Sequence, residues 1–137
     1  MTTEEFTIRL QENQEKAKAH IIAILTGPQD FETVYLHLRA YVACKYFLEG
    51  AEMETDNLIK LGDISTEKLA ELRRGGLEYA DKSVGCTSVA SSVTKKILLV
   101  LSLRKFLTDV TFDPDTVAET ATVSDLAQLI LQKLKGR

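Results

Sequence analysis

Histidine and acidic side chains are the first residues through which this chain could bind a metal. A di-iron helical bundle needs a glutamate three residues before a histidine, and neither His20 nor His37 has one. An HExxH motif and any group of cysteines and histidines at zinc-ligand spacing are also missing from the sequence. Four acidic residues do lie close together, a density that an acidic helix surface explains: Glu49, Glu52, Glu54 and Asp56. We therefore expect no metal site and no cofactor.

The two cysteines are the candidate nucleophiles. Cys44 lies within an apolar helical pattern, which is typical of a buried and inert thiol. Cys86 precedes a predicted helix, whose N-terminal field can lower the pKa of a thiol. The two residues form no CxxC pair, and neither has a histidine and a carboxylate at recognisable spacing, so we expect free cytosolic thiols and no catalytic residues. The chain is thus not predicted to be an enzyme.

One segment suggests a prosthetic group. The sequence Gly-Cys-Thr-Ser-Val that begins at Gly85 resembles the Gly-x-Asp-Ser-Leu segment of acyl carrier proteins, and the stretch from Phe112 onward is similar to the last third of that fold. The resemblance covers about residues 85–134 and implies a phosphopantetheine arm on Ser88, with Thr87 standing where the family has aspartate. An acyl-carrier-like protein is therefore our alternative hypothesis.

Basic residues are the candidates for a nucleic-acid surface. Four cations of one predicted helix, Lys95, Lys96, Arg104 and Lys105, spread around much of its circumference at about 100° per residue, so they resemble a solvated surface more than a phosphate track. The net charge is −3, without the basic excess of most nucleic-acid-binding proteins. We do not expect nucleic acid as a partner, and a small nucleic-acid-associated subunit is kept as a second alternative.

The elements that must position these residues are predicted to be helices. Apolar residues make up 45% of the 137, and only two prolines and seven glycines interrupt the chain. A capping box of Thr2 and Glu5 begins a helix that reaches about Leu25 and ends at Gly27-Pro28, with Gly27 in the left-handed conformation. Asp30 caps a second helix from Phe31 to at least Glu49, which is apolar over most of its circumference and so is predicted to be central.

The second half of the chain is predicted to continue the bundle. Gly62 is interpreted as a C-terminal cap and Ser65 as the N-cap of a third helix, which Gly75-Gly76 ends or kinks. A fourth helix follows from Thr87 or Ser88 to about Leu107. Pro114 opens a short helical turn, and Thr122 with Asp125 caps the last helix. These signals predict an all-α fold, a single domain over residues 1–137 with five to six helices around helix 31–49. Its core is predicted to contain Leu38, Val42, Phe47, Val93, Ile97, Val100 and Leu103.

No membrane segment is expected. The densest apolar run, Ile97 to Leu103, is far shorter than the roughly 20 residues that span a bilayer. The beginning of the sequence is acidic and precedes no short apolar run, so we expect no secretory signal and a cytoplasmic location.

Because these patterns do not favour metal binding, catalysis or nucleic-acid binding, we consider association with another protein chain. A seam of apolar residues recurs near heptad spacing on the first helix: Phe6, Leu10, Ala17, Ile21 and Ile24. The second helix carries more apolar surface than one neighbouring helix can cover. We therefore predict a non-enzymatic helical-bundle interaction protein, a structural subunit, adaptor or homodimer. The homodimer is slightly favoured, with the seam as its interface.

Overall fold

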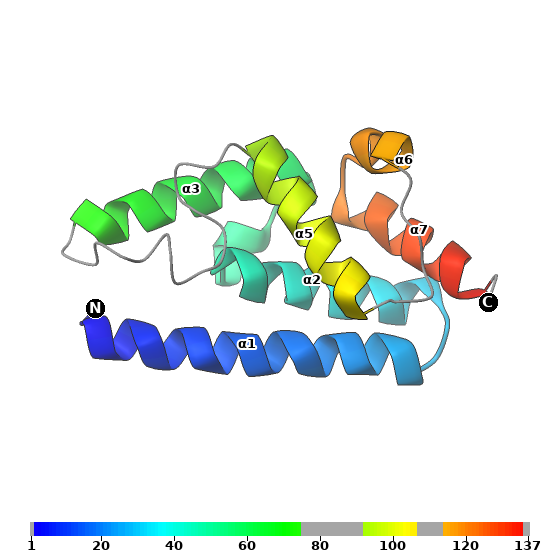
Figure 1. Ribbon diagram of the computed structural model, residues 1–137, viewed down its shortest axis with the longest axis horizontal. Coiled ribbons are helices and arrows are strands. Elements are labelled where there is room, and N and C mark those ends of the chain that lie inside the picture. Colours follow the sequence, from blue (N-terminus) through cyan, green and yellow to red (C-terminus); the bar gives the residue numbers. More distant parts are fainter. Residues whose placement is uncertain (1, 75–91, 107–113, 136–137) are drawn as a thin grey trace.

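The computed structural model describes residues 2–74, 92–106 and 114–135, and the chain is all-α over these ranges (Figure 1). The elements, in chain order, are α1 (Thr3–Thr26), α2 (Phe31–Tyr46), the short 3-10 helix η1 (Gly50–Met53), α3 (Leu58–Arg74), α5 (Ser92–Phe106), α6 (Pro114–Glu119) and α7 (Val123–Lys135). The predicted all-α bundle is confirmed.

Helix α2 lies inside the bundle, as its wide apolar surface predicts. It packs along α1 on one side and against α7 and α3 on the other (Figure 1). Its residues Val34, Leu38 and Val42 are fully buried, and they belong to one apolar cluster to which α1, α3, α5 and α7 also contribute. Aliphatic burial around α2 is therefore the main force that assembles the helices.

Local capping signals set the first two helix starts where they were predicted. The Thr2 hydroxyl accepts a hydrogen bond from the Glu5 amide at 3.1 Å, and the Glu5 carboxylate accepts one from the Thr2 amide at 3.2 Å. The Asp30 carboxylate accepts a bond from the Thr33 amide at 2.8 Å. Each cap satisfies amides that have no partner inside the first turn.

Helix α1 ends at Gly27, but the predicted left-handed cap there is wrong. Gly27 has φ −91° and ψ −172°, and its amide donates to the Ala23 carbonyl at 2.8 Å. A Cβ at this position would lie 2.6 Å from the Ala23 oxygen, so the close approach of backbone to backbone requires glycine.

The left-handed residue occurs instead at Phe47, which ends α2 three residues earlier than predicted. Phe47 has φ 59° and ψ 42°, a conformation that costs a residue with a side chain about 1–3 kcal/mol. Its ring packs edge-on against Phe6 at 5.1 Å between centroids and lies with Leu69 in a second buried cluster. Burial of the ring offsets the backbone cost. Gly50 then starts η1, so α2 does not continue through it.

Helix α3 corrects two predictions. It begins at Leu58 and runs through both Gly62 and Ser65, so neither residue is a cap. A Cβ on Gly62 would lie 3.2 Å from Ser92 Cα, so a small residue is needed where α3 meets the start of α5. Ser65 is fully buried, and its hydroxyl donates to the Tyr46 carbonyl at 2.7 Å, which satisfies an acceptor at the end of α2.

The starts of α3 and α7 are joined by the isolated antiparallel bridge between Asn57 and Thr122. The Asn57 side chain accepts from the Lys60 amide at 3.0 Å and caps α3, while Thr122 and Asp125 form the predicted capping box of α7. Asp56 links this joint to α2, because one of its oxygens accepts from the Tyr35 hydroxyl at 2.7 Å and the other from the Ser124 amide at 3.1 Å.

Helix α5 is rotated relative to the prediction. Leu99, Val100 and Leu103 are buried, but Val93 and Ile97 are 57% and 48% exposed, so the prediction that these two belong to the core is wrong. Lys95 and Lys96 are buried instead, which also corrects their assignment to a solvated surface. Apolar residues occur all around this helix, so its sequence does not define the inward face. Gly75-Gly76, the start of the predicted fourth helix and the segment 85–89 lie outside the described residues.

Candidate functional site

The predicted interface seam on α1 is covered by its own chain. Phe6, Ala17, Ile21 and Ile24 are at most 4% exposed, and Leu10 is half-buried against the cluster of Phe6, Phe47 and Leu69. Ala17, Ile21 and Ile24 belong to the main core around α2. A second copy could contact the four buried side chains only if α1 left its neighbours, so most of the seam is not a free surface in this fold.

The two histidines meet across α1 and α2, a proximity that the sequence did not indicate. Nδ1 of His20 lies 3.0 Å from Nδ1 of His37, and both side chains are half-buried. A bond between these atoms needs one ring to donate and the other to accept, so at least one ring is neutral. Burial lowers the pKa of His20, and the neighbouring His37 lowers it further. The described residues contain no group of three or more histidine, cysteine, aspartate or glutamate side chains that could hold a metal ion.

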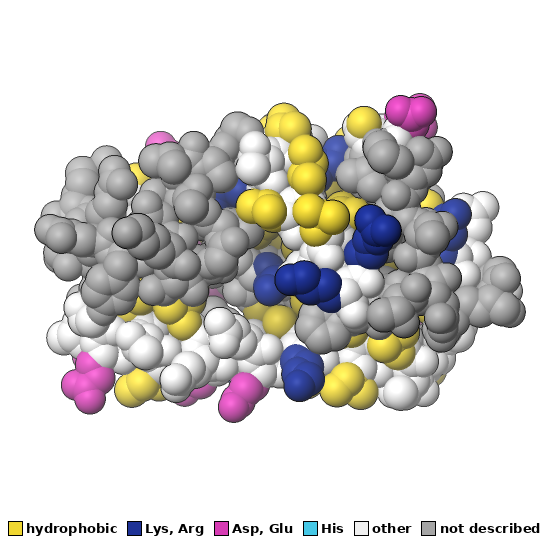
Figure 2. Space-filling model, viewed as in Figure 1, with side chains coloured by type: hydrophobic (Ala, Val, Ile, Leu, Met, Phe, Trp, Pro, Cys, Tyr) yellow, Lys and Arg dark blue, Asp and Glu magenta, His cyan; other side chains and the backbone are white. Residues whose placement is uncertain are grey.

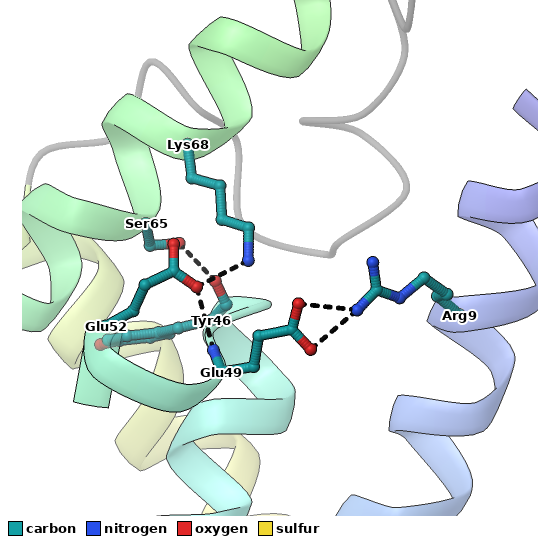
Figure 3. Close-up of polar contacts among 6 residues, drawn as sticks. All are labelled: Arg9, Tyr46, Glu49, Glu52, Ser65 and Lys68. Carbon is teal, nitrogen blue, oxygen red and sulfur yellow. Dashed lines mark hydrogen bonds and ion pairs between the residues drawn. The ribbon is translucent and has the colours of Figure 1, made fainter. Parts of the chain in front are cut away.

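Two of the acidic residues predicted to form a helix surface, Glu49 and Glu52, lie after the end of α2 and form structural contacts (Figure 3). One Nη2 atom of Arg9 on α1 lies 2.8 Å from both carboxylate oxygens of Glu49. The Glu52 carboxylate accepts from the Glu49 amide at 3.0 Å and from Lys68 Nζ on α3 at 2.8 Å. The bond to Arg9 is the main reason that the pKa of Glu49 is lowered. These contacts tie α1 and α3 to the turn, and the partners of both carboxylates are protein cations and amides.

Cys44 is a free, half-buried thiol on α2. Burial raises the pKa of this thiol, with a smaller opposite effect from Lys16, so it favours the protonated and unreactive form. This agrees with the interpretation of Cys44 as inert. Cys86 and Ser88 lie outside the described residues.

An apolar groove with a volume of about 600 Å³ lies beside α5. Ile59 of α3 lines it on one side, and Ala118, Thr120 and Ala121 line it on the side of α6 and the turn that follows. Helix α5 supplies the rest: Val93, Lys96, Ile97, Val100, Leu101 and Arg104. Figure 2 shows hydrophobic side chains gathered over α5, with Lys and Arg side chains beside them. We call this surface the α5 groove.

Three exposed residues of α5 give the groove its apolar edge. Val93, Ile97 and Leu101 follow one another at intervals of four and are 57%, 48% and 45% exposed. Residues four apart lie on the same helix face, so these side chains form a row about 12 Å long. Other large exposed apolar residues of the described chain, on α1 and α2, do not line this groove. The four-residue spacing of these side chains is visible in the sequence, but apolar residues at this spacing predict a buried helix face and not an exposed one.

The lining of the α5 groove contains two charged residues, and both are cations. Lys96 is almost fully buried, and its Nζ lies 3.3 Å from the Ala118 carbonyl, which holds α5 to the end of α6. Arg104 is exposed at the other end of the groove. The remaining lining residues are uncharged, so the groove combines an apolar wall with a basic end and contains no pairing of nucleophile and base.

The fold and this surface define an all-α helical bundle with an apolar groove along one helix. Comparison with protein-family models, with curated proteins and with solved structures found no match. Within the described ranges, every helix is too short or too polar to cross a lipid bilayer.

Proposed function

We propose that this chain is a non-enzymatic interaction protein that receives an apolar helix of a protein partner in the α5 groove. The observation that carries the proposal is the row of Val93, Ile97 and Leu101, which α5 exposes beside a concave surface. Helices bury such rows by placing the side chains of one helix between those of another. Exposed apolar rows next to a groove are typical of surfaces that bind amphipathic helices.

The partner proposed is a different protein. The homodimer seam expected on α1 is replaced in this proposal, because four of its five residues are buried within the chain and Leu10 is half-buried. A cytoplasmic location belongs to the same proposal and is supported by the free thiol of Cys44. Nucleic acid is not proposed as a partner, since Lys95 and Lys96 are buried and do not form a basic track with Arg104.

The test uses the full chain with a photo-crosslinking residue at Leu101, expressed in its native host. The control carries the same group at Ile22, which is 51% exposed on α1. The crosslinked protein is identified by mass spectrometry, purified and titrated against the wild-type chain. We expect crosslinks from position 101 only and saturable binding.

Two variants of the purified chain complete the test. Ile97→Asp should weaken the measured affinity for the identified partner by at least tenfold, because an unpaired carboxylate would be buried at the contact. Ile22→Asp is the matched control and should leave the affinity unchanged. Both side chains are about half exposed, so helicity by circular dichroism should not change in either variant. Equal affinity of the Ile97→Asp variant and the wild-type chain would refute the proposal.

A further inference from the structure

The charges around the α5 groove have a definite arrangement along the helix. Arg104 and Lys105 are exposed near the C-terminal end of α5, and neither forms an ion pair with a described residue. At the other end, the Ser92 hydroxyl donates to the Asp63 carboxylate, which places an acid beside the start of α5. Asp63 is not part of the groove lining, whose charged residues are the cations Lys96 and Arg104.

The basic end differs in sign from the chain as a whole. The chain contains 17 lysines and arginines against 20 acidic residues, a net charge of −3. The cations of the groove lining, Lys96 and Arg104, therefore do not reflect a basic composition. Charges at the edge of an interface act mainly by selecting partners of opposite sign and by excluding those of like sign.

A second copy of the chain does not suit this surface. A two-fold interface brings the same patch of both copies together. The described lining of the groove contains no carboxylate, so a second copy bound through the same surface would offer Arg104 no partner of opposite charge. Such a contact would lack charge complementarity at its edge.

We infer that the occupant of the α5 groove is an amphipathic helix from another protein, with acidic residues beside the part of its apolar face that meets Arg104. This inference rests on the proposed function and specifies the chemistry of the partner. The apolar face packs against Val93, Ile97 and Leu101, and the acidic side chains lie at the C-terminal end of α5. Lys96 is already bonded to Ala118, so the exposed Arg104 makes the selective contact.

A peptide library tests the inference even while the natural partner is unidentified. The probe is a displayed set of 18-residue helical peptides with a constant leucine face and flanking positions randomised equally among Glu, Gln and Lys. Selection is carried out in parallel on the wild-type chain, on Arg104→Glu, on Lys18→Glu and on Ile97→Asp. Lys18 is an exposed lysine on α1 and controls for a change in net charge.

We expect Glu to be enriched at flanking positions in binders of the wild-type chain and of Lys18→Glu, and not in binders of Arg104→Glu. A selected acidic peptide should lose about three- to tenfold in affinity on the Arg104→Glu variant, the size expected for exposed charge pairs that become repulsive. The loss should shrink at 1 M salt, where the Debye length is about 3 Å.

The other outcomes separate the inference from the proposed function. Binders that show no charge preference but are lost on Ile97→Asp would overturn the inference and leave the proposed function standing, and enrichment of Lys would do the same. If selection on the wild-type chain recovers no more binders than on Ile97→Asp, the proposed function fails with it. A wild-type dimer in light scattering that Ile97→Asp dissociates would assign the groove to a second copy and overturn the inference.

Discussion

The orientation of α5 can be tested with two leucines of the same helix. Leu103 is fully buried in the main core, whereas Leu101 is 45% exposed at the α5 groove. Replacing either residue by alanine removes the same atoms and changes helix propensity equally, so that the difference between the two variants isolates burial.

The expected magnitudes follow from the two environments. Leucine to alanine removes about three carbons, and at about 0.8 kcal/mol for each buried methylene the transfer loss at Leu103 is about 2.4 kcal/mol. A residual cavity adds to this, so Leu103→Ala should lower the free energy of unfolding by roughly 2.5–5 kcal/mol. At Leu101 about half of the loss applies and the site is open to solvent, so the cost should be about 1 kcal/mol or less.

The measurement is urea denaturation of both variants and the wild-type chain, followed by circular dichroism at 222 nm. The slope of unfolding free energy against urea should stay constant, because the surface exposed on unfolding hardly changes. Equal losses for the two variants, or a larger loss for Leu101→Ala, would mean that α5 turns a different face to the core. The α5 groove, and the proposals based on it, would then be wrong.

Three further perturbations address other parts of the molecule. The pKa of His20 is lowered in the folded chain, so the unfolded chain binds a proton at this residue more readily. The stability that the neutral His20 gives is fully present above pH 6.5 and is lost as pH falls through the lower pKa of the folded chain. Urea midpoints should therefore drop over that range, and should drop less in His20→Gln. Asp56→Ala should cost about 2–3 kcal/mol in the same denaturation assay, because it leaves the Ser124 amide and the Tyr35 hydroxyl without their acceptor, while a loss no larger than that of Tyr35→Phe would contradict this role. Thr122→Ala should lower the unfolding free energy by about 0.5–2 kcal/mol by removing the α7 cap, and Thr3→Ala, at an exposed first-turn position of α1, should have little effect.

The sequence by itself determined the class of fold and most helix starts. Thr2 with Glu5, Asp30, and Thr122 with Asp125 begin helices as predicted, because a cap depends on amides only a few residues away. The apolar surface of α2 also predicted its central position, since a helix that is apolar over most of its circumference must be covered on several sides.

Tertiary structure decided the features that depend on residues distant in the chain. Phe47 adopts the left-handed conformation because Phe6 and Leu69 bury its ring, and Ser65 lies inside a helix because the end of α2 offers it the Tyr46 carbonyl. His20 and His37 meet only because α1 and α2 pack in one register. The α5 groove is the clearest case. Apolar and charged residues are both spread around α5, so only its packing in the tertiary structure, chiefly against α3, determines that Leu99 and Leu103 face inward and that Val93, Ile97 and Leu101 remain exposed.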